Sequence, residues 1–185
     1  MNTIVTSREE LLAASRKIVK EQGIQALNMR AVAAAANVAV GSVYNYFPSK
    51  AELVSATVGD IWRDVFHAAG DCAGFSDFAS CVEWLFHSIR TGAGKYPGFL
   101  SAHMTGFAAQ DREKARRQMD RAFGHIRSNL EQVLARDTSV RADTFGAELS
   151  REAFVKFVFA NLLTCLSQEE ESIQILMAVI RRVLY

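Results

Sequence analysis

The stretch that decides the fold runs from residue 29 to residue 53 and reads MRAVAAAANVAVGSVYNYFPSKAEL. Asn28 can cap a short helix, Met29 to Ala36, whose alanines allow close approach of another helix. Asn37 follows, and Asn is one of the few residues other than Gly that tolerate a positive φ. A second short helix, Val40 to Tyr46, begins almost at once. Two short helices joined by so tight a turn are typical of a helix-turn-helix motif.

Longer helices are predicted on both sides of this pair. Ser7 and Glu10 have the spacing of a capping box, so a first helix begins after Ser7 and Gly23 is its natural stop. Pro48 ends the second short helix. The run Ser49-Lys50-Ala51-Glu52 is another capping box and starts a long helix, residues 50 to 69.

The residues of the second short helix are unusual for a helix that only packs in a core. Gly41, Ser42, Tyr44, Asn45 and Tyr46 are small or hydrogen-bonding. Gly41 costs a helix roughly 1 kcal/mol relative to Ala, which indicates that something approaches the backbone closely. Tyr and Asn offer the hydrogen bonds and flat contacts that DNA phosphates and base edges require. The alternative is that short amphipathic helices with small turns occur in any all-α protein.

Composition narrows the class of protein. The chain has 185 residues, half of them apolar, and a formal net charge of +1, divided as +2 over residues 1–55 and −1 over the remainder. Half apolar content argues against disorder, and two prolines permit long helices. Three widely spaced cysteines fit a reducing cytoplasm, and no export signal or membrane-spanning stretch is recognisable. We therefore expect a soluble, cytoplasmic, helical protein.

Residues 8–55 resemble the DNA-binding domain of the TetR (tetracycline-repressor) family of bacterial transcription regulators. The resemblance is strongest in Val40-Gly-Ser-Val-Tyr-Asn-Tyr-Phe47 and in Ser49-Lys50-x-x-Leu53. Asn28 stands where the family usually has a capping Thr, and Asn37 where it has a turn Gly. Ala39 replaces the usual Ser or Thr, which removes a cap and puts one phosphate contact in doubt.

The resemblance implies that the second short helix enters the major groove of DNA. Lys50 would meet a phosphate with its charge and the dipole of its helix. The residues implied as DNA contacts are Asn28, Arg30, Val40, Gly41, Ser42, Tyr44, Asn45, Tyr46 and Lys50.

Further helices are expected over residues 75–91, 98–109, 111–136, 149–166 and 170–184. The last two carry apolar stripes, which in the TetR family pack against a second copy as a four-helix bundle. The predicted dimer interface is Phe154, Phe157, Val158, Leu162, Ile173, Leu176, Met177, Ile180 and Leu184. The alternative is that both stripes face the chain's own core.

Aromatic side chains gather in the middle helices, the region where the family encloses an effector. Aromatic residues with a few polar groups suit an apolar pocket, and they suit a core equally well. The predicted ligand-binding residues are Trp62, Phe66, Trp84, His87, Phe99, His103, Phe107 and Phe123. His87, His103 and His125 are the candidates for orienting a ligand.

The sequence therefore predicts an all-α chain with two domains. Residues 1–50 form a three-helix helix-turn-helix DNA-binding domain, and residues 51–185 form a helical effector-binding and dimerisation domain. The predicted function is a homodimeric regulator, most simply a repressor, that binds a near-palindromic operator and is released by a small apolar or aromatic effector.

The sequence also bears on two other classes of function. The sequence shows no HExxH, CxxC, Walker or Gly-x-Ser-x-Gly pattern, which argues against an all-α enzyme, and no cofactor or metal is expected. A thiol-based redox regulator acting through Cys72 and Cys81 is the other alternative. The acidic Asp71 and Glu83 beside these thiols argue against it, because a reactive thiol needs an electropositive setting.

Overall fold

The computed structural model describes residues 6–70, 72–100, 112–166 and 171–185. Within these ranges the regular structure is helical throughout, as the sequence predicts. The described residues fall into two compact units, which do not follow chain order. The first comprises Met1–Val65 and Ala93–Met119, and the second comprises Phe66–Gly92 and Asp120–Tyr185. The predicted domain boundary at residue 50 stays a prediction.

The first unit begins with α1 (Arg8–Gln22), whose ends are set by local sequence. The Glu10 backbone N–H donates to the Ser7 hydroxyl (3.1 Å), and the Ser7 N–H donates to the Glu10 carboxylate (2.9 Å), so the capping box is confirmed. Gly23 stops the helix at φ 79°, where an L side chain would be strained. A single 3₁₀ turn, η1 (Ile24–Ala26), leads on.

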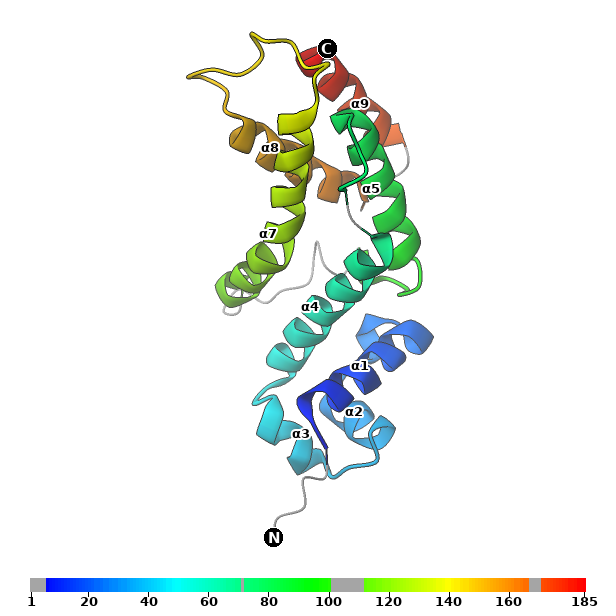
Figure 1. Cartoon of the computed structure of the whole chain (residues 1–185). Coiled ribbons are helices and arrows are strands. Elements are labelled where there is room, and N and C mark those ends of the chain that lie inside the picture. The colour runs from blue at the N-terminus through cyan, green and yellow to red at the C-terminus, as the bar shows by residue number, and fades with distance from the viewer. Residues whose placement is uncertain (1–5, 71, 101–111, 167–170) are drawn as a thin grey trace. The chain divides into compact units, whose positions relative to one another are not determined.

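Two short helices follow, α2 (Met29–Ala35) and α3 (Val40–Tyr46). Asn37 between them has φ 54°, so the predicted left-handed turn residue is confirmed. Helix α1 packs on α2, and α2 packs on α3 (Figure 1). The core they share is made of Leu11, Ile18, Val19, Leu27, Val32, Val43 and Phe47, with Leu53 from the next helix.

Helix α4 (Lys50–Ala69) begins as predicted, with the Glu52 N–H donating to the Ser49 hydroxyl (3.1 Å). Its residues up to Val65 belong to the first unit and its last turn to the second. In the first unit, Asp60 is buried and forms ion pairs with Arg16 of α1 (3.2 Å) and with Arg63 (2.8 Å). The Tyr96 hydroxyl donates to Asp64 (2.7 Å), which ties residues 93–99 to α4.

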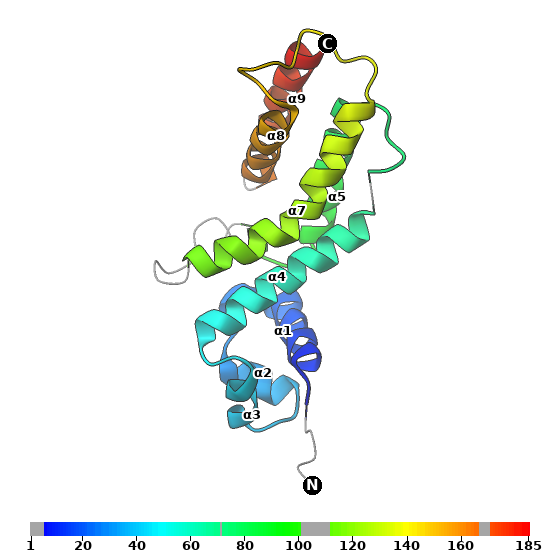
Figure 2. The same ribbon diagram turned by 60° about the vertical axis from the view of Figure 1, so that its left-hand side comes forward.

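The second unit contains α5 (Phe78–Ala93), most of α7 (Arg112–Arg136), α8 (Arg151–Leu166) and α9 (Glu171–Leu184). Helices α8 and α9 lie side by side (Figure 2). The predicted helix over residues 98–109 lies almost wholly outside the described residues. None of the described helices is both long and apolar enough to cross a membrane.

Candidate nucleic-acid interface

Helix α3 presents a broad surface to solvent. Val43 and Phe47 are buried under the helix, whereas Val40, Gly41, Tyr44 and Asn45 are exposed on one side of it, and Tyr46 is exposed on another. Because an α-helix turns by 100° per residue, these four exposed positions span an arc of only about 140°. Half of the Tyr44 surface is exposed, at 50%. A polar, aromatic surface of this kind on a short helix has the groups that read base edges and phosphates.

Gly41 has no internal packing reason to be glycine. A Cβ added to it would have no heavy atom within 4 Å. The backbone there is an ordinary helix, so neither strain nor crowding inside the chain excludes a side chain. The space above Gly41 is therefore open to another molecule.

Tyr46 lies on a different side of α3 from Tyr44. The two positions are roughly 200° apart around the helix. The Tyr46 hydroxyl donates a hydrogen bond to the Thr6 carbonyl (2.7 Å). This bond fixes the segment before α1 against α3, and it uses the one hydrogen that Tyr46 could give to a phosphate.

The remaining predicted DNA contacts differ in how free their polar groups are. The Asn28 side chain accepts from the Ala31 N–H (2.9 Å) and donates to the Ala26 carbonyl (3.0 Å), so its predicted role as helix cap is confirmed. Ser42 is half-buried, while Arg30 and Lys50 are exposed. Lys50 occupies the first position of α4. Ala39 makes no side-chain cap for α3, as predicted.

Sequence reasoning missed Arg8 as a member of this surface. Its guanidinium lies over the ring of Phe47 at 5.0 Å from the centroid, which holds a cation beside the end of α3. No local pattern connects Arg8 to Phe47, because the two residues are far apart in the sequence. The surface formed by Arg8, Val40, Gly41, Tyr44, Asn45 and Lys50 is called the α3 surface below.

The predicted ligand-binding residues do not converge on one described cavity. Trp62 and Phe99 are buried against each other in the first unit, with ring centroids 5.1 Å apart. In the second unit Phe66 packs on Phe123 (5.6 Å) and Trp84 packs on Phe75 (5.1 Å). His87 and His125 are exposed, and His103 and Phe107 lie outside the described residues.

The predicted dimer residues are mostly inside the second unit. Phe154, Val158, Leu162, Ile173, Leu176, Met177, Ile180 and Leu184 are all buried in the single chain. Phe157 is the exception, with 51% of its surface exposed. Ile175 and Val179 of α9 are also exposed, although the sequence did not single them out.

Comparison with known proteins identifies the domain that carries the α3 surface. Residues 11–57 match the family described as bacterial regulatory proteins, tetR family. This part of the chain is similar to the DNA-binding domain of the TetR family. The match covers α1 from Leu11 onward, α2, α3 and the first part of α4, so it includes every residue of the α3 surface except Arg8.

Curated relatives are similar over the same part of the chain. The HTH-type transcriptional repressor KstR of Mycolicibacterium smegmatis is 46% identical over 52 residues, which is 28% of this chain and 26% of KstR. KstR of Rhodococcus jostii is 47% identical over 57 residues, 30% of this chain and 27% of that protein. The matched part of the chain therefore spans only about a quarter of the length of these relatives.

Solved structures resemble the chain over nearly its whole length. BioQ, solved with its natural double-stranded DNA operator, has a TM-score of 0.69 at 17% identity, covering 96% of this chain and 98% of BioQ. RolR without ligand has a TM-score of 0.67 at 21% identity, covering 96% of this chain and 90% of RolR. A transcriptional regulator from Rhodococcus sp. Rha1 has a TM-score of 0.64 at 17% identity, covering 97% of this chain and 98% of that regulator. At these identities the likeness shows the fold, which confirms the predicted helix-turn-helix domain followed by a helical domain.

Proposed function

We propose that this chain is a DNA-binding transcriptional repressor of the TetR family that reads its operator with the α3 surface. The observation that carries the proposal is the open side of α3, where Gly41 and Tyr44 have no internal role that explains them. Lys50 and Arg8 supply cations at the margins of this side. Phosphate contacts fix the position of a protein on DNA, while contacts in the groove select the sequence.

We also propose that the operator is near-palindromic and that two copies of the chain bind it. A helix-turn-helix dimer places its two reading helices about one DNA turn apart, roughly 34–36 Å. The exposed apolar side chains Phe157, Ile175 and Val179 on α8 and α9 support a contact with a second copy. The predicted interface residues that are buried in the single chain would then support the exposed residues by packing beneath them.

Release by a small effector is the third part of the proposal. The aromatic cluster Phe66–Phe123–Phe159 in the second unit supports an apolar or aromatic effector. Helix α4 begins at the α3 surface with Lys50, and Phe66 in its last turn belongs to this cluster. An effector releases DNA only if it binds more tightly to the conformation that does not fit the operator.

The phosphate role of Lys50 gives the first experiment. Binding to a random-sequence duplex is measured by fluorescence anisotropy at several salt concentrations, for the wild type and for Lys50→Ala. Each phosphate neutralised contributes about 0.9 to the slope of log K against log salt, so the variant should lose about one unit of slope. An unchanged slope would remove Lys50 from the interface.

Lys20→Ala is the matched control for this experiment. Lys20 is exposed and lies in the last turn of α1. The Thr6–Tyr46 bond places the opposite end of α1 beside α3, and Lys20 is about 18 Å further along the helix than Arg8. The Lys20→Ala substitution removes one positive charge, as Lys50→Ala does, and should leave the slope of log K against log salt as in the wild type.

A further inference from the structure

The side chains of α3 carry no charge. The helix reads VGSVYNY and contains no Arg, Lys, Gln, Asp or Glu. The cations of the α3 surface come from other elements, because Arg8 belongs to α1 and Lys50 to α4. The exposed residues of α3 itself are therefore apolar, aromatic or amide. Such side chains select different bases from those that arginine and lysine select.

The helix is also short enough to lie within one groove of DNA. Seven residues at 1.5 Å per residue make it about 10 Å long, less than the roughly 12 Å width of the major groove. In a helix-turn-helix protein the N-terminal residues of the second helix contact base edges, while the first helix crosses the backbone. We therefore expect Arg30 of α2, like Arg8 and Lys50 at the margins, to meet phosphates, which leaves the base edges to α3.

Val40 offers methyl groups at the start of α3. It occupies the first position of the helix and is 36% exposed, whereas Val43 of the same helix is completely buried. Gly41 beside it adds no side chain, so the backbone on this side can come close to another molecule. At a base edge in the major groove, an apolar side chain contacts the 5-methyl group of thymine.

Asn45 offers an amide whose donor and acceptor are both available. The side chain is exposed, and no hydrogen bond among the residues that the structure describes uses it. The Asn28 amide, by contrast, bonds the backbone with its oxygen and with its nitrogen. An available amide can accept from N6 of adenine and donate to N7, which is the paired contact that selects adenine.

Val40 and Asn45 are placed to serve the same half of an operator. They are five residues apart, about 7.5 Å along the helix axis and about 140° around it. Successive bases of a strand are about 3.4 Å apart, so the two contacts fall about two base pairs from each other when α3 lies along the groove. Tyr44 lies between them around the helix, and its hydroxyl suits a phosphate.

We propose that the chain reads A·T base pairs in each half of its operator, with Asn45 bonded to an adenine and Val40 packed on a thymine methyl group. The exposure of these two side chains and the lack of charge on α3 carry this inference. Arg and Lys, the common readers of guanine, are missing from the helix. Ser42 is half-buried, and a hydroxyl bonds one base as well as another. The inference rests on the proposed function, because it names the bases that the α3 surface reads.

The first step of the test is selection of bound duplexes from a random pool. We expect each enriched half-site to contain A·T pairs that cannot be exchanged for G·C without loss of binding. An enriched half-site whose invariant pairs are all G·C overturns the inference and leaves the proposed function in place. A pool that stays random removes the proposed function, and this inference with it.

Base analogues, placed one at a time in the enriched half-site, then test the two contacts. 7-Deazaadenine lacks N7 but keeps its pairing with thymine, and uracil differs from thymine only in the missing methyl group. At one adenine, 7-deazaadenine should raise the Kd of the wild type about fivefold, the usual contribution of one hydrogen bond. At one thymine, uracil should raise the Kd about fourfold, the usual contribution of one buried methylene-sized group.

Substitutions in the protein connect each side chain to its base. Asn45→Ala should bind the adenine and the 7-deazaadenine duplexes equally, and Val40→Ala should bind the thymine and the uracil duplexes equally. Each variant is the matched control for the other, because it keeps the sensitivity that the other loses. Ala is the better helix former at both positions, so both variants should stay folded in thermal unfolding. If Asn45→Ala keeps the full response to 7-deazaadenine, or Val40→Ala the full response to uracil, the assignment is wrong.

Discussion

Tyr44 and Tyr46 are two residues apart on α3 and have different surroundings. Tyr44 is half exposed on the α3 surface, whereas the Tyr46 hydroxyl donates to the Thr6 carbonyl. The sequence alone assigned both to DNA, since side-chain type and spacing do not reveal a partner forty positions away. The structure favours separate roles, with Tyr44 available to DNA and Tyr46 holding the start of α1.

Replacing each tyrosine by phenylalanine separates these roles. Tyr44→Phe should raise the Kd for DNA about five- to tenfold, because one hydrogen bond contributes about 1 kcal/mol, and should leave stability unchanged. Tyr46→Phe should lower the free energy of unfolding by about 1 kcal/mol and change the Kd less than twofold. Anisotropy titration and urea unfolding measure the two effects. The opposite pattern would show that Tyr46 is the DNA contact.

Tyr96 gives a pH-dependent prediction at the same scale. Burial and the hydrogen bond to Asp64 raise the pKa of Tyr96 to about 12, from an ordinary value near 10. A raised pKa means that the hydroxyl contributes stability below about pH 10 and loses it as the pH rises toward 12. The stability difference between the wild type and Tyr96→Phe should therefore shrink from pH 8 to pH 11, in urea unfolding at both values. A difference that stays constant would mean that Tyr96 does not titrate in this way.

At the scale of the element, α3 carries a glycine, Gly41, that lowers the stability of the helix. Gly41→Ala should stabilise the chain by about 0.5–1 kcal/mol, because Ala is the better helix former and the added Cβ meets no atom. The same Cβ would stand in the space that we assign to DNA, so the Kd should rise at least tenfold. Thermal unfolding and anisotropy titration measure the two effects.

Gly59→Ala is the matched control for Gly41→Ala. Gly59 lies within α4, and a Cβ there would also have no atom within 4 Å. It should give a similar gain in stability with no change in the Kd. If Gly41→Ala binds DNA as well as Gly59→Ala does, the open side of α3 is not the reading surface.

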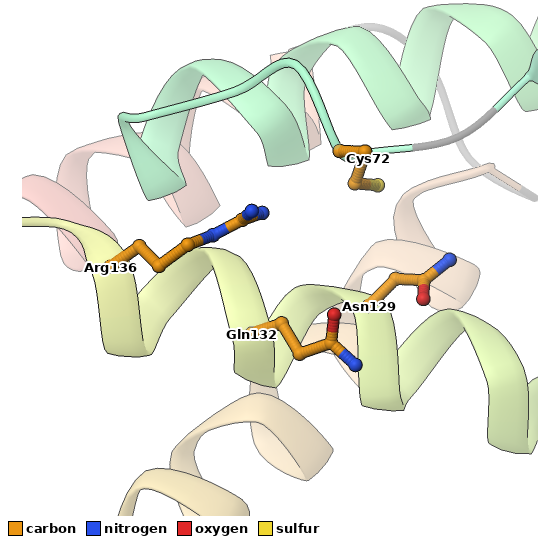
Figure 3. A pocket seen from close by; sticks show the side chains of 5 residues that line it. Cys72, Asn129, Gln132 and Arg136 are labelled. Atoms are coloured by element: carbon orange, nitrogen blue, oxygen red, sulfur yellow. The ribbon is translucent and has the colours of Figure 1, made fainter.

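The helix ends of the N-terminal domain could be predicted because the signals are local. Ser7 with Glu10, Gly23, Asn28, Asn37 and Ser49 each act within a few residues of their own position. The pocket lined by Cys72 and Arg136 (Figure 3) could not be predicted, because these residues are brought together only by the packing of α7 beside the turn before α5. The helix predicted from Leu149 begins instead at Arg151, where the Ser150 hydroxyl accepts from the Ala153 N–H (3.1 Å).

Periodicity also could not decide which side of α8 and α9 faces a second copy. An apolar stripe has the same spacing whether it packs inside the chain or outside it. The structure buries most of the predicted stripe, including Ile180, and exposes Phe157, Ile175 and Val179. A charge at Ile180 would therefore disturb the core, and a test of the dimer needs the exposed positions.

At the scale of the whole molecule, the assembly of two copies gives one prediction. Ile175 and Val179 are one helical turn apart on the same side of α9, and 69% and 40% of their surfaces are exposed. Val179→Asp should give folded monomers in light scattering, because it places a charge in the contact and not in the core. Gln174→Asp, about 100° from Ile175 and about 140° from Val179 around α9, is the control that should remain dimeric. A dimeric Val179→Asp would remove this side of α9 from the interface.

The central claim is that this chain recognises a specific DNA sequence as a symmetric pair. Selection of bound duplexes from a random pool, followed by sequencing, tests it most directly. The account predicts enrichment of one near-palindrome whose half-sites lie about one helical turn apart, and loss of that enrichment for Gly41→Ala. A pool that stays random after selection, with binding that depends only on salt, would contradict the account.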